Sequence, residues 1–150
     1  MKTLIDKTIV GFDPGTTTGF YKAKLELNNN NIVLGEHIEH GEIHNSMPDF
    51  ESRILNLIRD VDKVVIERAV MTGVMNRDKV TQLMVTERII AIIEIYGEIL
   101  ADKSKILIEK LHPETKKLCN NVPNEIKGGH ARDAYRILAA HLRISGRVSL

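Results

Sequence analysis

The feature that most constrains the fold is a β-branched apolar run that ends in an aspartate and turns. Thr8 to Phe12 has the composition of a strand buried on both faces, and Asp13 follows it. Pro14-Gly15 then predicts a tight turn into a second strand. A carboxylate at this place lies at the rim of a sheet, where binding groups collect. Asp13 is therefore a candidate corner of a metal site, although a simple turn residue has the same pattern.

The remaining elements follow from hydrophobic periodicity and turn residues. We expect strands over Phe20–Leu27, Ile32 toward Ile43, Val64–Ile66 and Lys105–Glu109, and helices over Phe50–Ile58, Arg77–Tyr96, from Pro113 and over His130–Leu142. The asparagine run at residues 28–31 predicts a hairpin turn. The order βββαβαβα predicts a mixed sheet, opened by three antiparallel strands, with helices on its faces.

Length and composition indicate an ordinary globular protein. Its 150 residues fit one domain spanning 1–150, and 43% hydrophobic with 27% charged residues is typical of that class. Cys119 is the only cysteine, so we expect a reducing, cytoplasmic interior. The apolar run Ile89–Ile93 is far shorter than the ~20 residues of a membrane span. No hydrophobic signal segment opens the sequence, so no membrane partner is expected.

The distribution of charge fits a phosphate-bearing partner. The net charge is only +1, but residues 101–150 hold ten Lys/Arg against five Asp/Glu, a local balance of 10 − 5 = +5. A basic face on a nearly neutral protein is compatible with nucleic-acid binding. A solvated charged surface explains the same pattern equally well.

Four candidate metal ligands fall at the ends of predicted elements. Asp13 closes the first strand and Glu67 the fourth, while His130 and Asp133 share one face of the first turn of the last helix. If the two strands are neighbours, their carboxyl ends bring the carboxylates together, and oxygen-rich ligands with one imidazole suit Mg²⁺ or Mn²⁺. Each residue has a structural alternative: Glu67 could be a surface partner of Arg68, and Asp133 a helix-dipole acid.

The order of these motifs resembles RuvC-type Holliday junction resolvases. Gly11–Gly19 looks like the family's opening motif, and Val64–Glu67 looks like its second acidic strand. The segment Arg68–Asn76 resembles the junction-facing loop that follows. Leu111–Lys117 resembles the family's Pro-x-x-(apolar)-Lys segment with altered spacing, and Gly129–Ala134 resembles its terminal acidic helix. The match covers almost the whole chain in order, and a viral or phage version would fit the compact length.

The resemblance implies a ribonuclease-H-like α/β fold, with a five-stranded sheet of three antiparallel strands followed by two parallel ones. It also implies a metal-dependent, homodimeric endonuclease that resolves four-way DNA junctions by symmetric nicks in a bacterial or phage-infected cell. Two Mg²⁺ or Mn²⁺ ions would be held by Asp13, Glu67, His130 and Asp133, with Asp13 bridging them. Lys116 or Lys117 would contact the scissile phosphate or balance charge, and the altered spacing leaves that choice open.

Recognition by DNA shape and phosphate charge is expected, because the tyrosines form no obvious base-stacking cluster. Candidates for DNA contacts are Arg68, Arg77, Lys79, Lys116, Lys117, Lys127, Arg132 and Arg136. The helix over Arg77–Tyr96 is apolar on more than one face, which favours a homodimer as well as burial within one chain.

Three rival functions stay open at this stage. A ribonuclease-H-like nuclease acting on RNA or on other branched DNA would use the same residues. The segment Asp13–Gly19 also resembles the phosphate loop of actin-like ATPases, which makes a nucleotide-binding module a second rival. Those ATPases need two such domains and a longer chain than 150 residues. A junction-binding protein without catalysis is the third rival, and the presence of all four candidate ligands counts against it.

Overall fold

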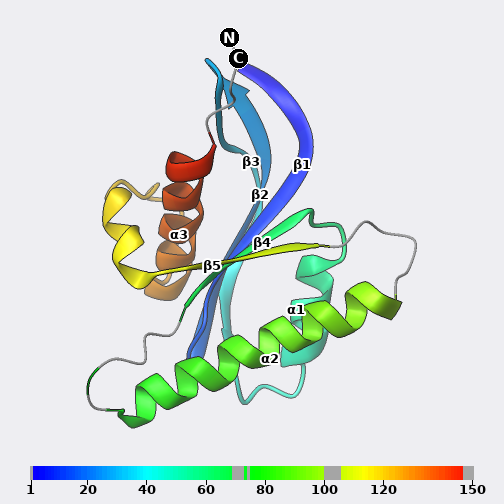
Figure 1. Cartoon of the computed structure of the whole chain (residues 1–150), viewed down its shortest axis with the longest axis vertical. Coiled ribbons are helices and arrows are strands. Elements are labelled where there is room, and N and C mark those ends of the chain that lie inside the picture. Colours follow the sequence, from blue (N-terminus) through cyan, green and yellow to red (C-terminus); the bar gives the residue numbers. More distant parts are fainter. Residues whose placement is uncertain (1, 69–72, 74, 100–105, 147–150) are drawn as a thin grey trace.

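The structure is built around a five-stranded sheet with the strand order β3-β2-β1-β4-β5 (Figure 1). The computed structural model describes residues 2–68, 73, 75–99 and 106–146. The strands are β1 (Lys2–Asp13), β2 (Thr17–Asn28), β3 (Asn31–His44), β4 (Lys63–Glu67) and β5 (Leu107–Leu111). β1, β2 and β3 pair antiparallel, and β4 pairs parallel with both β1 and β5. The predicted mixed sheet, three antiparallel strands and then two parallel ones, is confirmed.

Helices cover both faces of this sheet, as predicted (Figure 1). They are α1 (Phe50–Ile58), α2 (Arg77–Ile99), the 3₁₀ helix η1 (Pro113–Leu118) and α3 (Gly129–Ser145). Alternate residues of β1 belong to two hydrophobic cores on opposite faces of the sheet. Val10 and Phe12 pack with α1 and α2, while Ile9 packs with α3. Within the described part of the chain, no helix combines the length and the apolar character needed to cross a lipid bilayer.

The hairpin between β2 and β3 turns at Asn29 and Asn30, which have φ of 49° and 68°. Asparagine tolerates this left-handed region better than most residues, so the predicted turn at the asparagine run is confirmed. The pairing then continues to the far end of both strands, where Thr17 lies opposite His44.

Three predicted elements differ from the structure in their limits or burial. β1 starts at Lys2 rather than Thr8, since the residues before a bulge between Ile5 and Thr8 still pair with β2. α2 runs through Gly97 to Ile99, because one glycine costs only about 1 kcal/mol within a helix. β5 runs to Leu111 rather than ending at Glu109, and it is a largely exposed edge strand rather than a buried one.

Two predicted features fall outside the described residues. The expected start of the fifth strand at Lys105 lies there, as do residues 69–72 and 74 of the segment that resembles a junction-facing loop.

Candidate active site

Two of the predicted ligands meet at the carboxyl ends of neighbouring strands. β1 and β4 run parallel, with Phe12 opposite Ile66, so Asp13 and Glu67 follow side by side. Both side chains are buried, with 7% and 3% of the residue exposed. A carboxylate pair at this depth is held by the strands on either side and cannot swing into water.

Asp13 and Glu67 share a hydrogen bond that sets their charges. Burial of Asp13, with the hydrogen bond and charge of Glu67, raises the pKa of Asp13 to about 9. Burial also opposes ionisation of Glu67, but hydrogen bonds from Asp13 and Lys116 hold the pKa of Glu67 below its ordinary value. The protonated Asp13 therefore donates to the ionised Glu67, and the pair carries one proton between them.

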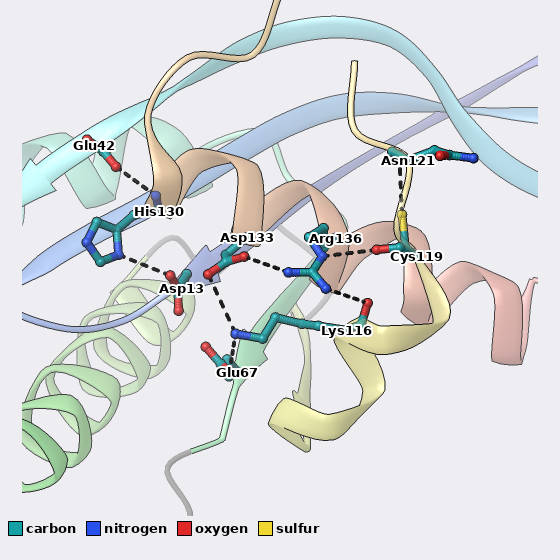
Figure 2. A network of polar contacts seen from close by, with 9 residues as sticks. All are labelled: Asp13, Glu42, Glu67, Lys116, Cys119, Asn121, His130, Asp133 and Arg136. Carbon is teal, nitrogen blue, oxygen red and sulfur yellow. Dashed lines mark hydrogen bonds and ion pairs between the residues drawn. The ribbon is translucent and has the colours of Figure 1, made fainter. Parts of the chain in front are cut away.

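The first turn of α3 supplies the other two predicted ligands (Figure 2). His130 Nδ1 lies 3.2 Å from Asp13 Oδ2, and Asp133 is one turn further along the same face. The backbone of α3 packs so tightly on β2 that a Cβ on Gly19 would overlap the carbonyl group of His130. The positive end of the α3 dipole thus faces the carboxylates.

Glu42 on β3 was not predicted as a site residue, and it fixes this helix start. Its Oε2 accepts a hydrogen bond of 2.8 Å from the backbone N–H of His130. Gly128 precedes the helix with φ of 92°, and a Cβ there would press on the Glu42 carboxyl group. Nothing in the local sequence marks Glu42; only the pairing of Gly19 with Glu42 reveals it.

Lys116 is the cation of the cluster. Its Nζ lies 2.8 Å from Glu67 Oε1 and 3.7 Å from Asp133 Oδ2 (Figure 2). Burial lowers the pKa of the ammonium group, but the hydrogen bond and charge of Glu67 outweigh burial and raise the pKa of Lys116 above its ordinary value. Lys117 is exposed and forms an ion pair with Glu114 in the same turn of η1. The structure thus brings Lys116, and not Lys117, to the predicted ligands.

The candidate DNA-binding residues are spread over several elements. Arg68, Arg77 and Lys127 are exposed. Lys79 is half-buried near the start of α2. The two candidate arginines on α3 are bound within the protein: Arg132 donates to the carbonyl groups of Pro123 and Ile126, and Arg136 donates to Asp133 and to two carbonyl groups beside it.

The donor set fits a hard divalent cation. Among the described residues, no three His, Cys, Asp or Glu side chains already surround a single point, because Lys116 separates Glu67 from Asp133. Carboxylate oxygens with one imidazole nonetheless match the preference of Mg²⁺ and Mn²⁺. Burial and, after it, the neighbouring carboxylates Glu67 and Asp133 raise the pKa of Asp13, and the opposing charge of Lys116 does not offset them. Asp13, Glu67, His130 and Asp133 could hold such an ion.

Comparison with known proteins assigns the fold. No protein-family model matches the sequence, and no curated protein matches it either. A Thermus thermophilus RuvC in complex with Holliday junction substrate has a TM-score of 0.63 at 12% identity, over 96% of this chain and 99% of that one. The chain has the RuvC resolvase fold. A Fowlpox virus resolvase in complex with Holliday junction DNA gives a TM-score of 0.54 at 12% identity, covering 91% and 99%.

A second Thermus thermophilus RuvC structure gives a TM-score of 0.58 at 15% identity, over 95% of this chain and 99% of that one. The predicted likeness to this fold is therefore confirmed, and it extends over nearly the whole length of both chains. Identities this low carry the arrangement of strands and helices, and the roles of individual side chains must rest on their own geometry.

Proposed function

We propose that this chain is a metal-dependent endonuclease that resolves four-way DNA junctions by paired, symmetric nicks. The observation that carries the proposal is the assembly of Asp13, Glu67, His130 and Asp133 at one rim of a RuvC-like sheet. Three further carboxylate or imidazole groups around a buried aspartate are costly for stability, which favours a functional reason for their presence. Residues 1–150 would act as one nuclease domain.

The contacts and exposure of the four ligands indicate a role for each of them. Two bound divalent ions would activate the attacking water and stabilise the leaving 3′ oxygen. Asp13 contacts both Glu67 and His130, so its carboxylate would suit the bridging role expected of it. His130 is half-exposed, so its imidazole can orient the water side of the site. On the opposite side of the site, Asp133 and Glu67 are linked by Lys116, which contacts both carboxylates.

Lys116 is the residue we assign to the scissile phosphate. Its ammonium group already lies within the carboxylate cluster, whereas Lys117 is bound to Glu114 at the surface. When cations occupy the carboxylates, the lysine is free to stabilise the negative charge that develops on the phosphate. Exposed Arg68, Arg77 and Lys127 would hold the DNA backbone without reading its sequence.

Cleavage of a synthetic four-way junction tests the function directly. We expect two cuts at symmetric positions on opposite strands, only with Mg²⁺ or Mn²⁺, and none in EDTA. Flap DNA, linear duplex, single strands and RNA–DNA hybrid serve as matched substrates with the same labelled strand. Equal cutting of the hybrid or of flaps would replace the proposal by a broader ribonuclease-H-like nuclease. Tight junction binding without any cutting would leave a non-catalytic binding protein.

A homodimer would place two such sites on one junction, and α2 provides a surface for it. Exposed apolar residues on α2 repeat at helical spacing: Val80, Met84 and Ile95 lie along one side and are 42%, 67% and 55% exposed. α2 also contributes Val85, Ile89 and Ile93 to the core, so the helix is apolar on opposite sides. A helix of this kind, covered on one side only, favours self-association.

Introducing charge on this outer side of α2 should separate the dimer. We expect the double variant Met84→Glu, Ile95→Glu to be a monomer at micromolar concentration by light scattering, with the wild type a dimer. Ile144→Glu is the control, because Ile144 is an equally exposed isoleucine on α3. A wild-type monomer, or a double variant that stays dimeric, would contradict the assignment of this surface.

A further inference from the structure

Arg136 on α3 reaches three acceptors with one guanidinium group (Figure 2). Its Nε donates to the carbonyl oxygen of Cys119 at 3.0 Å, and one terminal nitrogen donates to Asp133 Oδ1 at 3.1 Å. The other terminal nitrogen donates to the carbonyl oxygen of Lys116 at 3.4 Å. Such a fixed fork of donors is available to arginine and not to lysine.

The contacts matter because little else holds η1 in place. This 3₁₀ helix has six residues, none of them buried, so it has no hydrophobic anchor of its own. Short 3₁₀ segments are weak by themselves. Polar bonds from α3 therefore fix its carboxyl end: Arg136 binds Lys116 and Cys119, and Arg143 donates to the carbonyl oxygen of Leu118.

Arg136 also binds Asp133, the carboxylate that faces the Lys116 side chain. It binds one oxygen of Asp133, and the other oxygen of the same carboxylate faces Lys116 Nζ at 3.7 Å. Arg136 thus fixes the backbone from which Lys116 projects and the carboxylate toward which it projects. A loss of the fork would free the backbone end of the lysine and leave its ammonium group held by Glu67 alone.

We propose that Arg136 is a positioning residue that places Lys116 in the site, rather than a contact to the DNA backbone. Its side chain is only 29% exposed, and three of its five N–H groups are directed to acceptors inside the protein. This inference rests on the proposed role of Lys116 at the scissile phosphate. It goes beyond that role by naming what sets the lysine's geometry.

The test compares Arg136→Lys with Lys116→Ala and with the double variant in junction cleavage. Arg136→Lys keeps the charge and loses the fork, so we expect single-turnover cleavage to fall about 10- to 100-fold, as for residues that orient catalytic groups. The junction dissociation constant and its salt dependence should stay within about twofold of the wild type. The double variant should cleave no more slowly than Lys116→Ala. Arg136 acts through Lys116, so the two losses should not add.

Arg143→Lys is the matched control on the same helix. Arg143 makes a single bond to η1, which a lysine can replace, and it touches neither Asp133 nor Lys116. Cleavage by Arg143→Lys should stay within about threefold of the wild type, the range of a surface exchange. Additive losses in the double variant would overturn the positioning role. Arg136→Gln removes the charge as well: a weakened junction dissociation constant with a salt slope reduced by about one in that variant would identify Arg136 as a phosphate contact instead.

Hydrogen exchange separates this inference from the proposed function. In Arg136→Lys, amides of residues 114–119 should exchange at least tenfold faster than in the wild type or in Arg143→Lys, while the β1 amides stay protected. This result is expected whether or not the protein cuts junctions. If the wild type is inactive but η1 loosens as described, the proposed function fails and the positioning of Lys116 stands. Unchanged exchange would overturn the positioning role itself.

Discussion

Asp13→Asn should abolish junction cleavage while leaving junction binding intact. The amide has nearly the same shape as the carboxyl group but cannot carry the charge that binds a divalent ion. We expect a loss on the order of 10³-fold in cleavage rate, equivalent to about 4 kcal/mol of transition-state stabilisation. Glu67→Gln should behave alike, because its carboxylate contacts both Asp13 and Lys116. The measurement is single-turnover cleavage beside a binding titration in Ca²⁺ or EDTA.

The same substitution should stabilise the metal-free protein. The unfolded carboxyl group ionises near 3.8, and in the folded protein the pKa of Asp13 is about 9. When the pKa of an acid is higher in the folded than in the unfolded protein, the free energy of unfolding falls as pH rises above the unfolded pKa. The fall ends above the folded pKa, because the acid is then ionised in both states. The neutral asparagine escapes this cost. In EDTA at pH 8, the melting temperature of Asp13→Asn should therefore exceed that of the wild type, and the difference should shrink toward pH 4.

Asp6→Asn is the control for both measurements, since Asp6 lies on the same strand and is exposed. It should change neither cleavage nor melting temperature. Undiminished cleavage by Asp13→Asn would exclude Asp13 as a metal ligand. A lower melting temperature in EDTA would instead indicate that the ionised carboxylate stabilises the fold.

The fold was largely predictable because the local sequence pattern identifies its core strands and helices. Val64–Ile66 is apolar on both faces and lies on an interior strand of the sheet, and Phe50, Ile54, Leu57 and Ile58 form the buried stripe of α1. The limits of β1 and β5 were not predictable in the same way. They depend on which distant strand offers a hydrogen-bonding edge, and local periodicity carries no information about that edge.

In the candidate site, too, the local sequence predicts some residues, and tertiary contacts decide the others. Asp13 and Glu67 were found because each ends a buried strand, and the parallel pairing of β1 with β4 then brings them together. The choice between Lys116 and Lys117 could not be made from spacing. It depends on how a 3₁₀ turn directs successive side chains, and only the docking of η1 on α3 settles that direction.

Arg136 shows what charge alone leaves open. In the sequence it is one of several basic residues in a positively charged region, and DNA contact was the natural expectation. In the structure its guanidinium group is directed to Asp133 and two carbonyl groups. Buried polar acceptors compete with phosphates for arginine, and the competition is decided by tertiary contacts that no single-sequence pattern records.

Gly19→Ala should damage stability and cleavage together. A Cβ on Gly19 would overlap the backbone of His130, so α3 must move away from β2. Overpacking of this kind costs about 1–3 kcal/mol or more, which lowers the melting temperature of a chain this long by roughly 4–10 °C. Because the shift carries His130 away from Asp13, cleavage should also fall by at least about 100-fold.

Gly15→Ala is the matched control, since its added methyl group would meet only the Thr17 carbonyl oxygen at an ordinary 3.5 Å. Gly15 lies in the turn between β1 and β2, and Gly19 lies in β2 opposite Asp13, so general weakening of the Asp13 loop would affect both variants, whereas displacement of α3 would affect Gly19→Ala alone. Thermal melting followed by junction cleavage at a temperature where both variants are folded separates the two effects. A Gly19→Ala protein with wild-type cleavage would mean that His130 does not depend on the contact between α3 and β2.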